Sequence, residues 1–307
     1  MRFAAVVVFA CSLLLVGCGG GGGGLPTSTQ PEPPAGSLEA LWKAPGEDVA
    51  VVPGASDFAP GTSRYTFLVV DGRGKPAERP TARVWLARGL KQAPFEQTTA
   101  RLENVGVPGG YTADVTQLYV ATLDLPKPGR YWLLAEPVGG RKIQAIGTVD
   151  VKAKPAAPAV GDRAFASQTP TLATAGGNLK LLTTRAPPDT ELLRDSVAGS
   201  LAAHVPFVVA FATPKFCTSR TGGPGVDVVD AVRRRLTGTG VRFIHVEIYE
   251  RNDPANGFNR WVREWKLPTE PWVFLVGSDG RIKARFEGAV SVRELEAAVR
   301  ATLLRKS

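Results

Sequence analysis

Cysteine and histidine are scarce in this chain, which has three cysteines and two histidines among 307 residues. Cys11 and Cys18 lie near the start, so Cys217 is the only thiol in the rest of the chain. A single thiol excludes an internal disulfide there. We find no His/Cys cluster with metal-ligand spacing, no phosphate-binding loop and no hydrolase triad. The sequence therefore predicts neither a metal nor another cofactor.

Long apolar runs are also lacking, and the run at the start of the chain is too short for a membrane-spanning helix. Arg2 supplies a positive charge, residues 3–14 are apolar, and Leu15-Val-Gly-Cys18 follows. This tetrapeptide resembles the bacterial lipobox, which is cleaved before a cysteine that is then lipidated. We therefore expect a signal peptide at 1–17 and a protein anchored to membrane lipid through acylated Cys18, on the extracytoplasmic face of the cell membrane. The alternative is an ordinary secretory signal, or a weak transmembrane anchor, with a chance cysteine.

Composition divides the remaining chain. Residues 18–37 are rich in Gly and Pro, which predicts a tether, and residues 152–163 form an Ala/Pro linker. Two folded segments, 38–151 and 164–307, are expected on either side of that linker. The formal net charge is +9, and Arg233-Arg-Arg235 is its most concentrated part. This run either attracts anionic lipids or wall polymers or is a solvated helix face. Nothing resembles a nucleic-acid motif, so we expect no nucleic-acid partner.

Residues 38–151 contain short strand-like segments with turns between them. They lie at 64–70, 82–87, 119–125, 130–135 and 143–151. Strands at this spacing favour a β-sandwich. The turn Leu125-Pro-Lys-Pro-Gly129-Arg-Tyr131 is similar to one in bacterial immunoglobulin-like modules. The segment has no cysteine, so it lacks the disulfide of antibody domains.

Residues 164–307 show a different order of segments. Apolar strands or runs are expected at 206–211, 241–248, 267–276 and 281–286, and helices at 226–236, around Trp261 and Trp265, and after Ser291. Ser291-Val-Arg-Glu294 has the spacing of a capping box. This order resembles the thioredoxin superfamily. The implied fold class is multi-domain: an N-terminal all-β immunoglobulin-like sandwich followed by a C-terminal α/β thioredoxin-like domain.

The resemblance implies a redox site whose cysteine pair is incomplete. Thioredoxins carry Cys-x-x-Cys where a central strand meets a helix. Here either Gly222 and Gly225 or Cys217 and Arg220 occupy the two positions. On a Cys-x4-Cys pattern that resembles related surface proteins, Cys217 is kept and Gly222 stands at the partner position. No intramolecular pair can form in any of these matches. The family also keeps a cis-proline facing the motif, and Pro271 matches it; the alternative is a trans proline at a strand start. The catalytic candidates are therefore Cys217, Arg220 and Pro271.

Three roles for Cys217 stay open. It is a single-thiol nucleophile assisted by Arg220 and Lys215, an inert relic, or a buried structural residue. The first role predicts thiol-redox activity toward extracytoplasmic protein thiols or peptides, and the second a degenerate descendant that lacks the resolving cysteine. A different class of function is a non-enzymatic envelope binding or scaffold protein. His245, and Trp261 with Trp265, are expected to be core residues, the tryptophans alternatively forming a substrate platform.

Overall fold

The computed structural model describes residues 32–47, 49–107, 115–139, 144–217, 220–222 and 224–304. Contacts divide the chain into Met1–Glu32 and Pro33–Ser307, and all the elements described below lie in the second unit. The predicted signal peptide, Cys18 and most of the tether lie outside the described residues. Among the described residues, no helix has the length and apolar character needed to cross a membrane.

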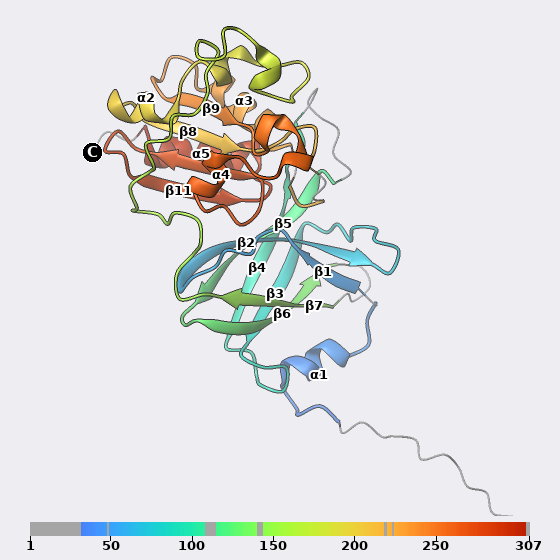
Figure 1. The fold of residues 1–307 in the computed structure, drawn as a ribbon. Helices are drawn as coiled ribbons and strands as arrows, with labels where there is room; N and C mark the ends of the chain where they lie inside the picture. The colour runs from blue at the N-terminus through green and yellow to red at the C-terminus, as the bar shows by residue number, and fades with distance from the viewer. Residues whose placement is uncertain are drawn as a thin grey trace, which may run out of the picture. The chain divides into compact units, whose positions relative to one another are not determined.

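Seven strands of the N-terminal part close into a barrel (Figure 1). They are β1 (Val49–Pro53), β2 (Gly61–Asp71), β3 (Thr81–Ala87), β4 (Glu96–Asn104), β5 (Gln117–Leu125), β6 (Gly129–Pro137) and β7 (Ala145–Val151). Their order around the barrel is β1-β2-β5-β4-β3-β6-β7. Neighbours are antiparallel except β1 and β7, whose parallel pairing at Ala50 and Ile146 closes the ring.

Alternating side chains fill the barrel interior, as the two-residue period of a strand requires. Phe67 lies between Tyr65 and Tyr119, with ring centroids 5.4 and 5.2 Å away. The Tyr119 hydroxyl donates to the Ala77 carbonyl at 2.9 Å, and burial raises the pKa of both tyrosines. This aromatic column fills the barrel interior beside β2 and β5.

The C-terminal part contains a four-stranded sheet. Its strands are β8 (Phe207–Phe211), β9 (Arg242–Val246), β10 (Trp272–Val276) and β11 (Ile282–Glu287), in the order β11-β10-β8-β9. Strands β8 and β9 are parallel, and the other two pairs are antiparallel. Every residue of β8 and β10 is buried, because both faces of the sheet are covered.

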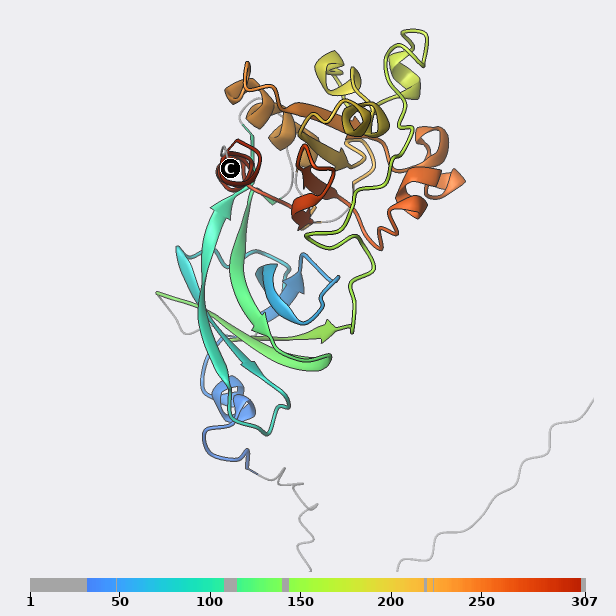
Figure 2. The same ribbon diagram turned by 90° about the vertical axis from the view of Figure 1, so that its left-hand side faces the viewer.

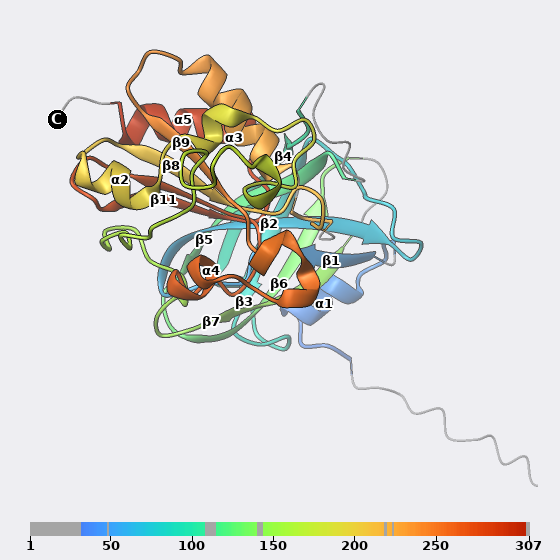
Figure 3. The same cartoon turned by 45° about the horizontal axis from the view of Figure 1, so that its top comes forward.

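Two helices cover one face of this sheet, namely α3 (Gly225–Arg235) and α5 (Val292–Thr302) (Figure 3). The Ser291 hydroxyl accepts a hydrogen bond from the Glu294 N–H at 3.1 Å, which confirms the predicted cap of α5. The other helices are short: α1 (Leu38–Lys43), α2 (Val197–Ala202) and α4 (Arg260–Glu264). Four 3₁₀ turns, Leu179–Leu181, Thr190–Leu193, Glu250–Asn252 and Pro254–Asn256, complete the elements of the described residues.

The predicted fold class is wrong in both halves. The strands of residues 38–151 are not a two-sheet immunoglobulin-like sandwich, because the pairing of β1 with β7 closes one continuous barrel. The chain is also not a sandwich followed by an α/β thioredoxin-like domain. Its fold is β-rich, with the barrel, a small four-stranded sheet and only five α-helices among the described residues. Alternating apolar residues predict buried strand faces, and they do not specify how a sheet ends or closes.

The barrel and the sheet meet at a polar joint. The N–H groups of Ser56 and Asp57 donate to the Glu287 carboxylate at 3.0 and 2.9 Å. The Arg64 guanidinium donates to the Ala289 carbonyl at 2.8 Å and pairs with Glu294. Beside these bonds, Gly288 allows a close approach to the Gly54 backbone, because a Cβ on Gly288 would lie 2.2 Å from the Gly54 carbonyl oxygen.

Asp57 also connects the joint to the predicted linker. Its carboxylate accepts the N–H groups of Ala156 and Ala157 at 2.7 and 3.0 Å and pairs with Arg285 at 3.2 Å. The Asp57 side chain is fully buried, so these partners replace the water that its charge would otherwise need. The boundaries of the two predicted domains on either side of residues 152–163 stay a prediction.

Candidate functional site

Several titratable side chains gather at one end of the sheet. Phe211, the last residue of β8, pairs with Val246 of β9 and with Trp272 of β10. The segments that follow β8 and β9 and precede β10 therefore lie at the same edge. They carry Cys217, then Glu247 and Tyr249, and finally Glu270.

Cys217 and Glu270 are the central pair of this site. Cys217 is half-buried, and its N–H donates to the Thr213 carbonyl at 3.1 Å. Its thiol donates a hydrogen bond to the Glu270 carboxylate. Burial raises the pKa of Glu270 to about 7; the nearby Glu247 charge adds to the rise and the thiol opposes it. The carboxyl group therefore changes its protonation state close to neutral pH.

One carboxylate oxygen of Glu270, Oε2, is buried and has no hydrogen-bond partner among the described residues. An unpartnered buried oxygen favours the protonated, neutral form of the carboxyl group. This agrees with burial as the largest cause of the raised pKa. Glu270 is thus suited to hold a proton beside the thiol.

Glu247 and His245 form a second, deeper layer. The Glu247 Oε1 atom accepts from the N–H and the hydroxyl of Thr184 at 2.5 and 2.7 Å. His245 Nε2 lies 3.0 Å from the Ala212 carbonyl, and burial lowers the pKa of its imidazole. His245 is thus a buried residue, as the sequence predicts, and its neutral ring donates to that carbonyl.

Tyr249 lies at the outer side of the cluster. Its ring packs against Phe216 at a centroid distance of 6.5 Å and stacks on Phe258 at 5.6 Å. The pKa of its hydroxyl is raised by burial and then by the nearby charges of Glu270 and Cys217. Tyr249 therefore remains a neutral phenol beside the thiol at physiological pH.

The three residues predicted as catalytic occupy different surroundings. The Glu270–Pro271 peptide bond is cis, and Pro271 faces Gly225 at the start of α3. Arg220 donates to the Gly74 carbonyl at 2.8 Å, so its guanidinium reaches the barrel. Lys215 lies 5.1 Å above the Phe216 ring. The structure therefore brings Cys217 together with Glu270, the residue before Pro271.

Sequence reasoning missed Glu270, Glu247 and Tyr249. Glu247 and Tyr249 could have been found from their spacing. They follow His245 at intervals of two residues, so an extended chain places all three side chains on the same face. Glu270 directly precedes the proline that the sequence did single out. Acidic residues at such places are usually exposed, so neither position indicates a site without the fold.

A cavity of about 160 Å³ adjoins Glu270. Its walls come from both parts of the chain: residues 53–56 of the barrel on one side, and Thr221, Thr269, Glu287 and Gly288 on the other. Ser56 and Thr269 both donate hydroxyl hydrogen bonds to Glu287, at 2.9 and 2.7 Å. Among the described residues that line this cavity, Glu270 has a buried acceptor atom, Oε2, without a hydrogen-bond partner.

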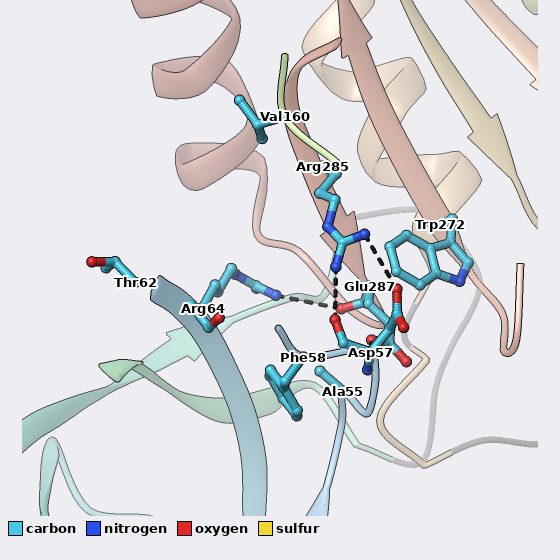
Figure 4. Close-up of a pocket in the computed structure, with 10 residues that line it drawn as sticks. Ala55, Asp57, Phe58, Thr62, Arg64, Val160, Trp272, Arg285 and Glu287 are labelled. Atoms are coloured by element: carbon cyan, nitrogen blue, oxygen red, sulfur yellow. Dashed lines mark hydrogen bonds and ion pairs between the residues drawn. The ribbon is translucent and has the colours of Figure 1, made fainter. Parts of the chain in front are cut away.

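A second cavity, of about 170 Å³, lies within the joint (Figure 4). Arg285 points at Asp57, and Arg64 points at the backbone of Glu287. The charged groups that line the cavity are engaged with one another, so it is a polar seam between the barrel and the sheet. Among the described residues, no three His, Cys, Asp or Glu side chains are arranged to hold a metal ion.

Comparisons with known proteins assign no family. No family model and no curated protein matches the sequence. Among solved structures, the chain is similar to MtrC from Shewanella baltica OS185, with 13% identity and a TM-score of 0.22. The match covers 38% of this chain and 24% of MtrC. A match this weak supports no argument about fold or function. The thioredoxin-like resemblance is wrong, because the described fold is β-rich, with a closed seven-stranded barrel, a small four-stranded sheet and little helix.

Proposed function

We propose that this protein is a lipid-anchored extracytoplasmic protein with a single-thiol redox site formed by Cys217 and Glu270. The lipid anchor rests on Leu15-Val-Gly-Cys18 and on the Gly-rich residues that follow it. The redox site rests on one observation, the hydrogen bond between the Cys217 thiol and a carboxyl group whose pKa is about 7.

The raised pKa decides how well Glu270 accepts the thiol proton. An ordinary glutamate has a pKa of 4.5, so the shift to about 7 is 2.5 units, or about 3 kcal/mol. The higher pKa makes Glu270 a stronger base toward the thiol proton. A thiolate forms when Glu270 is ionised and takes the proton, and the thiolate is the reactive species.

The proposed reaction is exchange with an external disulfide. Cys217 transfers its proton to Glu270, and the thiolate attacks one sulfur of the disulfide. A mixed disulfide with Cys217 forms as the original S–S bond breaks, and the departing thiolate takes the proton from Glu270. The chain after Cys18 has no second thiol, so a second external thiol must release the product.

The test measures the rate of Cys217 with a neutral aromatic disulfide between pH 5 and 9. In the unmodified protein we expect the rate to rise around pH 7, where Glu270 ionises. Glu270→Gln should remove that step and slow the reaction at pH 7 by about tenfold or more. Glu250→Gln, an exposed glutamate after β9, is the matched control. Identical pH profiles in the Glu270→Gln protein and the parent would contradict the proposal.

The second candidate function is non-enzymatic binding in the cell envelope. It is supported by Arg220, whose bond to the Gly74 carbonyl ties the loop after Cys217 to the barrel. A Cys217 that reacts no faster in the native protein than in an unfolded one would favour this role. Partner binding should then be unchanged after alkylation of Cys217.

A further inference from the structure

The barrel carries an aromatic wall at the place where the predicted tether reaches the folded unit. Helix α1 lies against the outer face of β3 and β6, where Leu38 is fully buried with Ala87 and Leu134. The N–H groups of Leu38 and Glu39 donate to the carbonyls of Gln92 and Leu90 at 2.9 and 2.8 Å. The first helix is therefore fixed to this side of the barrel.

This wall lies on the opposite side of the barrel from the sheet. The outer face of β2 and β5 packs against Ala289 of the C-terminal part. In the order β1-β2-β5-β4-β3-β6-β7, strands β3 and β6 lie across the ring from β2. Figures 1 and 2 show α1 on the side of the barrel that faces away from the sheet.

Large apolar side chains are concentrated here. Three of the six tryptophans, Trp42, Trp85 and Trp132, lie on α1 and on the strands beneath it. Trp42 is 36% exposed, and Phe95, which directly precedes β4 and packs on Tyr131 at a centroid distance of 5.8 Å, is 49% exposed. We call Trp42, Trp85, Phe95 and Trp132 the aromatic wall. Exposed tryptophan is typical of surfaces at the boundary between lipid and water.

Basic residues border the wall. Lys91 and Lys127 are exposed, and Arg88 lies over the Tyr131 ring at 3.9 Å. None of the three forms an ion pair with another described residue, whereas Lys43 and Arg130 are paired with Glu39 and Asp150. Asp124 and Glu96 lie nearby and reduce the net positive charge, so apolar contact contributes more than charge.

The chain length brings this wall close to a membrane. Fourteen residues separate Cys18 from Pro33, and a chain of that length spans at most about 50 Å. A surface held this close to lipid has an effective concentration in the millimolar range, so weak contacts suffice to keep it there.

We propose that the aromatic wall lies on the lipid surface to which Cys18 is anchored, with the sheet and Cys217 directed away from the membrane. This inference rests on the proposed lipid anchor for its geometry. Its test does not, because the unlipidated protein can be used. A phospholipid interface is the occupant that matches exposed tryptophan, bordering lysines and a short connection to an acylated residue.

The experiment uses the chain from residue 18 onward with Cys18→Ser, mixed with vesicles of phosphatidylcholine and phosphatidylglycerol. Sedimentation gives the partition coefficient. We expect measurable binding that falls by about tenfold or more when Trp42→Ser and Phe95→Ser are combined. The matched control combines Val160→Ser and Leu181→Ser, which are both 60% exposed and lie outside the barrel. Circular dichroism verifies that each variant is folded.

A second measurement locates the contact. Lipids brominated near the headgroup should quench tryptophan fluorescence, and Trp42→Phe should reduce that quenching. No binding of the parent protein, or an equal loss in both double variants, would overturn the inference. A lipid-free dimer that Trp42→Ser with Phe95→Ser dissociates would assign the wall to a second copy and overturn it as well. Failure of lipidation at Cys18 is detected separately, by membrane fractionation of the full chain.

Discussion

Gly288→Ala should destabilise the protein far more than an ordinary surface substitution. Gly288 has a φ of 72°, where an alanine is strained by about 1–2 kcal/mol. A Cβ at this position would also lie 2.2 Å from the Gly54 carbonyl oxygen, so the two backbones must separate. Separation weakens the three hydrogen bonds that Ser56 and Asp57 donate to Glu287, at about 1 kcal/mol each. The expected total loss is about 3–5 kcal/mol.

The matched control is Gly240→Ala. Gly240 has a φ of 80°, and a Cβ there meets no atom within 4 Å, so only the backbone strain of about 1–2 kcal/mol applies. Urea unfolding followed by fluorescence gives the free energy of unfolding of both variants. The Gly288→Ala loss in the free energy of unfolding minus the Gly240→Ala loss gives the contribution of the contact between the barrel and the sheet. Equal losses in the two variants would refute the reasoning that this contact is tight.

Three further outcomes are expected. Arg285→Met leaves the fully buried Asp57 carboxylate without its closest cation and should cost about 3 kcal/mol in urea unfolding, whereas the exposed Arg281→Met should cost little. The folded protein holds the Glu270 proton up to about pH 7, whereas the unfolded chain holds it only to 4.5. The free energy of unfolding should therefore fall by about 3 kcal/mol as the pH rises from 4.5 to about 7. Glu270→Gln should flatten the slope of the free energy of unfolding against pH. Protease cleavage within residues 155–158 should give fragments that elute together in gel filtration, because the joint holds them, and separate elution would contradict this.

The sequence predicted the positions of most strands but not their closure. Segments 64–70, 82–87, 119–125 and 130–135 lie within β2, β3, β5 and β6, because their alternating apolar residues fill the interior. β4 was missed, since Glu96-Gln-Thr-Thr carries little apolar pattern. A sandwich and a barrel use the same alternation, and the pairing of β1 with β7 joins residues far apart in sequence.

The candidate site was predicted only in part. Cys217 was recognised because it is the only thiol after Cys18. Glu270 was not, because its importance comes from burial and from the neighbouring Glu247, which depend on the way the strand ends meet. Arg220 was predicted to assist Cys217, but a sequence does not show where an arginine side chain points. In the structure the Arg220 guanidinium donates to the Gly74 carbonyl of the barrel.

The joint between the barrel and the sheet has a consequence for the order of assembly. Its bonds connect residues 56–64 with residues 287–294, at sequence separations of 223 to 231 residues. They cannot form until almost the entire chain has been synthesised. In a chain that ends before Glu287, β1 can still pair with β2. Ser56 and Asp57, which lie between these strands, then lack the Glu287 carboxylate that accepts their hydrogen bonds. C-terminal truncation should therefore leave an incomplete seam on a barrel whose own strands are all present.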